Sequence, residues 1–295
     1  MTEQSPGLRL LDPADRAEGG DPPAGFVRRR VDLPVRDEVL SLTVDVPDRP
    51  MRLAEAVPLV YAIDDRLIGM YLRHAERAGR EIYCKKGCGV CCTRYLIVYS
   101  PAEMYHVMDV IEQMPPERRR PIRDWLEQMA RLARQTGLID RLTHAGPDEK
   151  PLDMIEKWWF EQGRTTCPFL EDGACGIYPH RFVACREFYS HSGPEHCEHL
   201  QTTRMPTPLT AINVLWQLED RLTAAGGGVL TLPLMKLWAD VRTEEARRTW
   251  PAVEIVDPLF ALLAETAQQA QRLTTGATVA PPDAEGSADR PPTSV

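Results

Sequence analysis

The sequence predicts a mainly α-helical protein with a small irregular cysteine-rich β-hairpin element, that is, a metal-centred α+β domain. Three observations lead to this fold class. After residue 59, apolar residues recur at steps of three or four over most of the chain, which is typical of amphipathic helices. Seven of the eight cysteines lie between Cys84 and Cys185. No internal repeat and no regular alternation of strands and helices is visible, which argues against a parallel-sheet fold.

Size and composition indicate a soluble globular protein of one or two domains, with 295 residues, 43% hydrophobic and 26% charged. A net charge of -8 argues against a dedicated nucleic-acid binder, which gains affinity from a basic face. The sequence has no apolar run of about 20 residues, and its opening lacks a secretory pattern. We therefore expect no membrane insertion and a cytoplasmic location.

Composition also predicts how the chain is divided into segments. Both ends are rich in proline, glycine and small polar residues, which cannot bury enough apolar surface to offset the entropy of ordering. The predicted segments are a disordered tail over 1–25, a short extended segment over 26–58, a cysteine-cluster metal-binding domain over 59–200 with a helical insert over 100–163, a helical segment over 205–275, and a second disordered tail over 276–295.

The first elements follow from periodicity. Apolar residues at every second position from Leu40 to Val46 predict a half-buried strand, and a partner strand is expected over 26–33. From Leu59 the spacing changes to three or four residues. This change predicts an amphipathic helix that ends near Gly79 and leads the chain into Cys84.

A capping signal predicts the next helix. Ser100-Pro101-Ala102-Glu103 supplies a capping hydroxyl, a first-turn proline and a reciprocal glutamate, so a helix should begin there and run to about Met114. Further helices are expected around 122–132, 152–159, 215–222, 234–238 and 259–267. Asp257-Pro258 is the predicted start of the last one.

The first cysteine group reads Cys84-Lys-Lys-Gly-Cys88-Gly-Val-Cys91-Cys92. Its glycines allow the backbone to fold tightly around a small bound group. Cys88-Gly-Val-Cys91 has the spacing of a metal-binding knuckle. The adjacent Cys91 and Cys92 point their side chains in different directions. Binding of both to one ion would be strained, whereas a cluster or a second metal could use both.

The second cysteine group runs from Cys167-Pro-Phe-Leu through Cys175-Gly-Ile-Tyr to Cys185-Arg. Glu171-Asp172-Gly173 lies between two short apolar stretches and has turn chemistry. A hairpin is therefore predicted here, and it would bring Cys167 and Cys175 close together.

Two dense cysteine groups favour metal binding over disulfides in a reducing compartment, and over buried free thiols. Nearby basic residues are expected to lower the thiol pKa and so favour the ligand form. These are Lys85, Lys86, Arg94, Arg181 and Arg186. Zinc prefers four ligands in a closed tetrahedral site, whereas ligation by cysteine alone also suits iron-sulfur clusters. Seven thiols are more than one zinc ion or one iron-sulfur cluster requires, and we favour an iron-sulfur cluster slightly.

These motifs resemble the YkgJ-like cysteine-cluster family, a zinc- or iron-chelating CxxCxxCC domain, over roughly residues 80–190. The family pattern is a C-x3-C-x2-C-C group followed by C-P-F-L, C-x-I-Y and C-R groups, all of which occur here. Arg181-Phe182 departs from the Arg-Pro of many members and leaves the ligand set untouched. The resemblance implies metal binding through Cys84, Cys88, Cys91, Cys92, Cys167, Cys175 and Cys185.

The resemblance also implies alternatives to simple metal binding. One branch of the family comprises flagellin lysine N-methylases, so a metal-dependent, S-adenosylmethionine-using protein lysine N-methylase with a protein substrate is the enzyme hypothesis. A structural zinc module and a metal carrier are the others. The first three cysteines also fit the radical S-adenosylmethionine spacing, but Val90 stands where an aromatic residue is usual, and the partial barrel of that fold is not predicted.

Two histidines flank the eighth cysteine. His196 and His199 could offer nitrogen ligands to zinc beside Cys197. Loop-forming residues just before them favour a polar, exposed loop instead, and Cys197 lies outside the family pattern.

The remaining motifs have structural explanations. Trp158-Trp159-Phe160 is expected in a core. The arginine runs at 28–30 and 118–120 are expected on solvated faces, because no aromatic residues are interleaved with them. The acidic Glu171-Asp172 pair is explained by the turn. No Ser-His-Asp set, phosphate loop or dinucleotide fingerprint is visible, so no catalytic residue is assigned.

Overall fold

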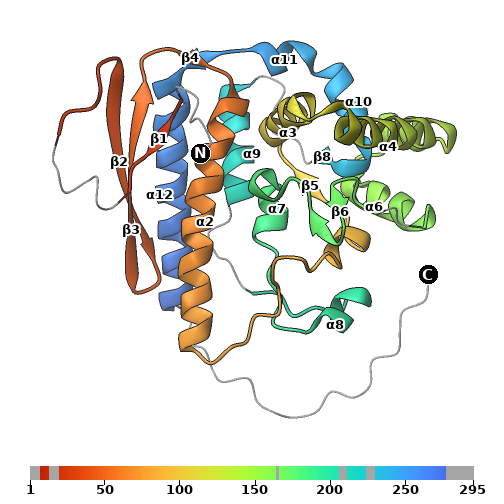
Figure 1. The fold of residues 1–295 in the computed structure, drawn as a ribbon, viewed down its shortest axis with the longest axis horizontal. Coiled ribbons are helices and arrows are strands. Elements are labelled where there is room, and N and C mark those ends of the chain that lie inside the picture. Colours follow the sequence, from red (N-terminus) through yellow and green to blue (C-terminus); the bar gives the residue numbers. More distant parts are fainter. Residues whose placement is uncertain (1–6, 13–19, 164–165, 206–210, 224–229, 277–295) are drawn as a thin grey trace.

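The computed structural model is mainly α-helical and carries a few small antiparallel sheets (Figure 1), which confirms the predicted fold class. It describes the whole chain except residues 1–6, 13–19, 164–165, 206–210, 224–229 and 277–295. Much of the two predicted tails therefore lies outside the described residues. Among the described helices, none is long and apolar enough to cross a membrane.

In the described residues, the α-helices are α2 (Leu53–Arg77), α3 (Pro101–Gln113), α4 (Pro116–Gln135), α5 (Leu138–Thr143), α6 (Pro151–Glu161), α7 (Val183–Arg186), α8 (Pro194–Glu198), α9 (Ala211–Leu222), α10 (Met235–Val241), α11 (Thr243–Arg247) and α12 (Ala252–Gly276). The short 3-10 helices are η1 (Cys91–Thr93), η2 (Tyr178–His180) and η3 (Leu232–Leu234). The strands are β1 (Arg9–Leu10), β2 (Phe26–Val35), β3 (Glu38–Pro47), β4 (Pro50–Met51), β5 (Val98–Tyr99), β6 (Leu170–Glu171), β7 (Ala174–Cys175), β8 (Leu230–Thr231) and β9 (Trp250–Pro251).

The largest sheet has the strand order β1-β3-β2 and is antiparallel. β2 and β3 are the predicted strand and its predicted partner, and they form an antiparallel hairpin with Val35 opposite Glu38 beside the turn. The sequence does not predict β1, which pairs with β3 at the sheet edge. Asp45 of β3 is buried although it alternates with the apolar residues. Its carboxylate accepts a hydrogen bond of 2.7 Å from Arg28 Nε on β2, so the charge is paired.

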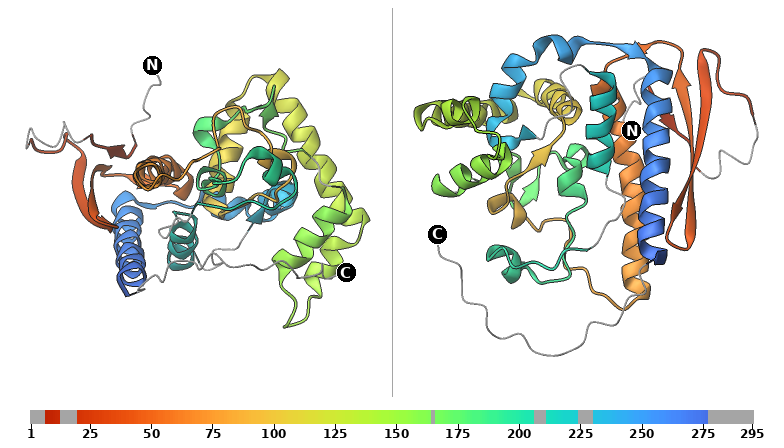
Figure 2. Two further views of the ribbon diagram at one scale, coloured as in Figure 1. Left: turned by 90° about the horizontal axis from the view of Figure 1, so that it is seen from below. Right: turned by 180° about the vertical axis from the view of Figure 1, so that it is seen from behind.

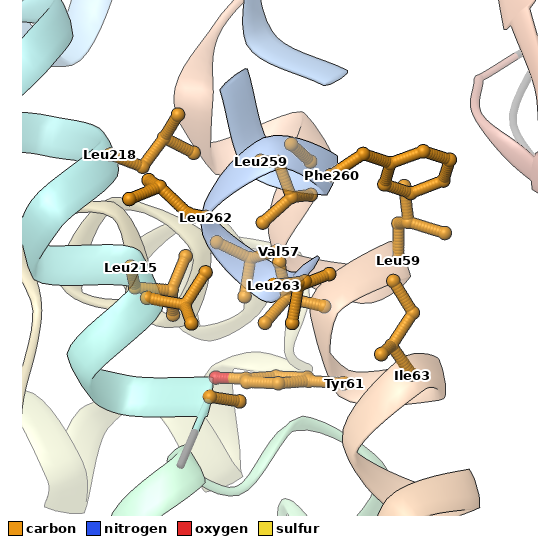
Figure 3. Close-up of a cluster of buried hydrophobic side chains, with 14 of the residues drawn as sticks. Val57, Leu59, Tyr61, Ile63, Leu215, Leu218, Leu259, Phe260, Leu262 and Leu263 are labelled. Carbon is orange, nitrogen blue, oxygen red and sulfur yellow. The ribbon is translucent and has the colours of Figure 1, made fainter. Parts of the chain in front are cut away.

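The main core lies between this sheet and three helices. Figures 1 and 2 show α12 and α2 beside the sheet, with α9 on the far side of α12. α12 packs against both β2 and α9. Figure 3 shows how side chains from the three helices meet. The labelled ones are Val57, Leu59, Tyr61, Ile63, Leu215, Leu218, Leu259, Phe260, Leu262 and Leu263. Burying one such aliphatic or phenylalanine side chain stabilises the fold by about 1.5–3 kcal/mol.

The capping signal at Ser100 is confirmed. The Ser100 hydroxyl accepts a 3.2 Å hydrogen bond from the backbone N–H of Glu103, whose carboxylate in turn accepts one of 3.0 Å from the backbone N–H of Ser100. α3 begins at the following proline and ends at Gln113. α2 begins at Leu53, between one and two turns before the predicted start at Leu59, and includes Pro58.

Three buried carboxyl groups hold helix N-termini together across the core. Glu103 accepts a 2.7 Å hydrogen bond from the first N–H of α7, and Glu219 accepts one of 2.5 Å from the second residue of α3. Glu187 accepts one of 2.6 Å from the first residue of α9. Each pairing satisfies a backbone donor that a helix cannot satisfy itself. These contacts fix the relative positions of α3, α7 and α9.

The helical insert forms the opposite side of the molecule from the sheet (Figure 1). Trp158 and Trp159 of α6 are buried, with Met129 of α4 and Leu138 of α5 in the same cluster. The Trp158 indole N–H donates to the Thr136 hydroxyl at 2.9 Å. This confirms the predicted core role of the two tryptophans.

The predicted start of the last helix at Asp257-Pro258 is wrong. α12 begins at Ala252, and Pro258 lies inside it. The start is set by distant contacts, because β9 pairs with β4, and the Ala252 N–H donates to the Arg49 carbonyl at 3.1 Å. A sequence motif cannot report such a long-range pairing.

Glu219 makes the stability depend on pH. Burial raises the pKa of this carboxyl from 4.5 to about 8. Between these values the unfolded chain has lost the proton and the folded chain keeps it, so the free energy of unfolding falls as pH rises. The slope from one such group is about 1.4 kcal/mol per pH unit.

We expect Glu219→Gln to remove this contribution, because the amide keeps an acceptor for the α3 N–H without a titrating proton. Denaturant unfolding of the variant and the wild type from pH 5 to 9 measures the difference. The exposed neighbour substitution Asp220→Asn is the control and should leave the slope unchanged. A Glu219→Gln curve parallel to that of the wild type would contradict the assignment.

Candidate metal centre

Cysteines from segments far apart in the sequence line one cavity of about 210 Å³. They come from the loop before η1, from η1 itself, from the β6-β7 hairpin and its approach, and from α7. The six lining cysteines are Cys88, Cys91, Cys92, Cys167, Cys175 and Cys185. About 10–15 Å³ of such accessible space holds one water molecule, so the cavity exceeds the space that a single metal ion needs.

The loop at 87–92 packs directly on the hairpin. Gly87 has a φ of +90°, which favours glycine. At Gly89 an added Cβ would lie 2.8 Å from Leu170 Cδ1 and 3.0 Å from the Gly173 carbonyl oxygen. A side chain there would push the two cysteine segments apart, so the glycine permits their close approach.

The hairpin has the predicted turn. Leu170 pairs with Cys175 and Glu171 pairs with Ala174. Asp172 and Gly173 both have positive φ, at 48° and 79°, as in the tight turn that suits the twist of a two-residue hairpin. The pairing puts Cys175 at the hairpin end nearest Cys167.

A backbone hydrogen bond joins the two cysteine groups. The Cys167 N–H donates to the Cys92 carbonyl oxygen at 2.8 Å. The predicted convergence of the first and second groups is therefore present in the fold, although the helical insert separates them in the sequence.

Arg186 anchors the last cysteine of the cavity. Its side chain is buried, and its Nε donates to the Arg181 carbonyl at 2.9 Å. Its Nη1 forms a 2.5 Å ion pair with Asp65, and the guanidinium lies 4.3 Å from the Tyr61 ring centroid. These contacts hold α7, and with it Cys185, against α2.

Thiol contacts and burial favour the protonated form of several cavity thiols. Contact with Cys167, together with burial, raises the pKa of the Cys92 thiol to about 12. Contact with Cys92 and burial raise the pKa of Cys91, and burial raises the pKa of Cys185 well above its usual value. Arg181 lowers the pKa of Cys185 as predicted, but burial outweighs it. The expectation that basic neighbours make the thiols acidic is therefore wrong for these groups.

The donor set fits a soft metal centre, because the cavity offers up to six sulfur ligands and no carboxylate. Among the described residues, no three histidine, cysteine or acidic side chains already converge closely enough to hold a metal ion. The thiols form hydrogen bonds with one another instead: Cys92 pairs with both Cys91 and Cys167. A metal would replace these S–H contacts and take the thiolates as ligands.

Aromatic and basic side chains form the rest of the wall. Arg181 lies 4.2 Å from the Tyr178 ring centroid, and Arg204 lies 4.7 Å from that of Phe188. Both arginines line the cavity together with Lys85. Their positive charge would balance part of the negative charge that several thiolates bring to a metal centre.

The predicted ligands divide into two places. Six of the seven line the cavity, but Cys84 does not. Its Sγ accepts a 3.2 Å hydrogen bond from the backbone N–H of Ser190. The sequence did not single out Arg204 or Phe188 as wall residues. Phe188 follows Cys185 by three positions, about one helical turn, which is the signal that could have placed it on the same face.

The segment around the eighth cysteine differs from the predicted exposed loop. Residues 194–198 form α8, and Cys197 is buried. His196 and His199 are exposed. One face of this short helix is buried, so the Cys197 side chain points inward, whereas the flanking histidines face solvent.

Residues 83–207 match the family described as "CxxCxxCC: Putative zinc- or iron-chelating domain". This part of the chain is similar to that cysteine-cluster family. The matched range contains both cysteine groups and Cys197, and it supports metal binding by the domain. No curated protein and no solved structure gave a match to the chain.

The close approach at Gly89 predicts a selective effect of adding a methyl group. We expect Gly89→Ala to lower the free energy of unfolding by about 1–3 kcal/mol, because overpacking would force the hairpin away from the loop. Gly69→Ala is the control, since its Cβ would lie no closer than 3.5 Å to any atom. In the middle of α2 it should stabilise by about 0.5–1 kcal/mol. Equal stability of the two variants in denaturant unfolding would refute the close-packing explanation.

Proposed function

We propose that the cysteine-lined cavity binds an iron-sulfur cluster. The observation that carries the proposal is the convergence of six cysteines from separate segments on one cavity of about 210 Å³. Iron-sulfur clusters are held by cysteine thiolates and occupy more space than one ion. When bound, such a cluster supplies electron transfer or an iron site open to a ligand.

The cavity favours a cluster over a single zinc ion for two reasons. A structural zinc site is filled by four ligands in a closed tetrahedron, and the cavity offers more thiols and more volume than that. Its basic wall of Lys85, Arg181 and Arg204 also suits a centre with excess negative charge. Zinc held by four of these thiols, in a structural or carrier role, is the alternative.

A second candidate function is a metal-dependent protein lysine N-methylase that uses S-adenosylmethionine. One observation favours it, namely that the cavity wall continues past the thiols onto aromatic side chains, including Tyr95, Tyr178 and Phe188. Tyr178 is 38% exposed, so the cavity is accessible from solvent there. Absence of S-adenosylmethionine binding by the metal-loaded protein, measured by calorimetry, would exclude this candidate.

Metal and sulfide analysis tests the cluster. We expect protein purified without oxygen to contain iron and acid-labile sulfide in equal amounts and to absorb visible light. Cys175→Ser should reduce all three signals at least about tenfold, because it removes a thiolate ligand. Ala184→Ser is the matched control, since it places the same hydroxyl in the same cavity wall without removing a thiol.

Each outcome has a distinct meaning. Iron and sulfide that survive Ala184→Ser but are lost from Cys175→Ser support the cluster. Zinc without acid-labile sulfide would show that the site binds zinc and not an iron-sulfur cluster. A folded wild-type chain that contains neither iron nor zinc would refute the proposal.

A further inference from the structure

A second cavity, of about 70 Å³, lies where the β2-β3 turn meets the end of α2. None of the described residues that line it is a cysteine or an acidic residue. Its nitrogen-bearing side chains come from the β2-β3 turn, from α2 and the loop after it, and from the segment before α8. They are Arg36, His74, Arg80 and His191, and the rest of the lining is aromatic or apolar.

Arg36 brings a positive charge that its neighbours do not neutralise. Its Nη1 donates to His74 Nε2 at 2.9 Å, and its guanidinium lies 5.9 Å from the Tyr71 ring centroid. Because an arginine N–H can only donate, His74 Nε2 is the acceptor and this imidazole is neutral. The Arg36 Nε is buried and has no hydrogen-bond partner. Its φ of 57° lies in the region that favours glycine or asparagine in such turns, so turn formation does not explain an arginine here.

His191 supplies a second buried nitrogen without a partner. Its Nδ1 donates to the Glu81 carbonyl oxygen at 2.9 Å, which fixes the orientation of the ring. Its Nε2 is buried and has no hydrogen-bond partner. Leaving a buried polar atom unpaired is costly, and such atoms normally have a partner. Arg36 and His191 line the same cavity, so one bound group inside it could satisfy both.

Charge and size indicate what that group is. Arg36 and Arg80 bring two positive charges to a lining without acidic residues. The C-terminal end of α2 opposes them with only about half an elementary charge, and its His74 and Ala75 carbonyls already accept hydrogen bonds from the N–H groups of Ala78 and Arg80. At about 10–15 Å³ for each water-sized group, the cavity has room for the five non-hydrogen atoms of a phosphate ion.

We propose that this cavity binds a phosphate-class oxyanion, either as the free ion or as the phosphoryl group of a larger ligand. Arg36 and Arg80 donate charge-assisted hydrogen bonds to its oxygens. His191 Nε2 accepts from a protonated phosphate oxygen, or donates when the ring itself carries a second proton. Donors from separate segments suit a tetrahedral anion better than a planar carboxylate. Arg80 is exposed, so the ligand enters on its side.

This site is independent of the proposed cluster, because the two cavities share no lining residue. It has a structural consequence for the first cysteine group all the same. A bound oxyanion would join the β2-β3 turn to residues 80–81, which precede Cys84 by only a few positions.

Isothermal titration calorimetry of the full chain with inorganic phosphate tests the site, at an ionic strength held constant with chloride. We expect saturable binding with a Kd of about 1 mM or tighter. Arg36→Gln and Arg80→Gln should each weaken binding at least about tenfold, because each removes a charge-assisted donor. Arg73→Gln is the matched control and should change the Kd less than about twofold. It removes the same charge from an exposed position on α2 outside the cavity.

The same titration with methyl phosphate identifies the source of the anion, and circular dichroism verifies that each variant folds. Tighter binding of methyl phosphate assigns the phosphoryl group of a larger ligand, and tighter binding of inorganic phosphate assigns the free ion. Either result supports the site when both cavity variants weaken it. An absence of saturable binding of both probes up to about 10 mM, or an equal loss in Arg73→Gln and the two cavity variants, overturns the proposal.

Discussion

The carboxyl group of Glu103 holds the part of the structure on which the cysteine cavity depends. It caps its own helix α3 at Ser100, accepts the first N–H of α7, and accepts a 3.3 Å hydrogen bond from the Tyr61 hydroxyl of α2. Burial raises its pKa from 4.5 to about 7, and the backbone donors oppose that rise. Because α7 carries Cys185, this one side chain sets the position of the cavity wall relative to the main core.

Burial of the thiols constrains what the cavity can do. Several thiolates cannot share a poorly hydrated space without a compensating cation, because transfer of a charge from water is costly. The thiols of Cys91, Cys92 and Cys185 therefore favour the protonated form, and binding to a metal would release their protons. The arginines in the wall reduce this cost but do not remove it, as the raised pKa of Cys185 indicates.

Local signals predicted the elements that depend on local chemistry. The capping sequence at Ser100 and the turn at Asp172-Gly173 specify their own backbone geometry, so α3 and the β6-β7 hairpin were predictable. The start of α12 was not, because pairing with residues near Arg49 fixes it. The two places into which the cysteines divide were also beyond prediction, since Ser190 has no signal in the sequence that marks it as a neighbour of Cys84. Side-chain direction in η1 depends on a 3-10 conformation that spacing alone does not reveal.

The hydrogen bond from Cys167 to Cys92 also constrains the order of folding. Its two ends are separated by the whole helical insert, so closing this contact from an unstructured chain carries a large loop entropy. Contacts of α4 with α5 and of α5 with α6 are local in the sequence, and once formed they shorten the effective loop. Contacts of α4 with η3 and α10 are not local, so the insert is also held by residues that follow the cysteine segments. The thiols therefore come together only when this long-range packing forms, and in a chain that has not completed it they are separate and open to solvent and to metal.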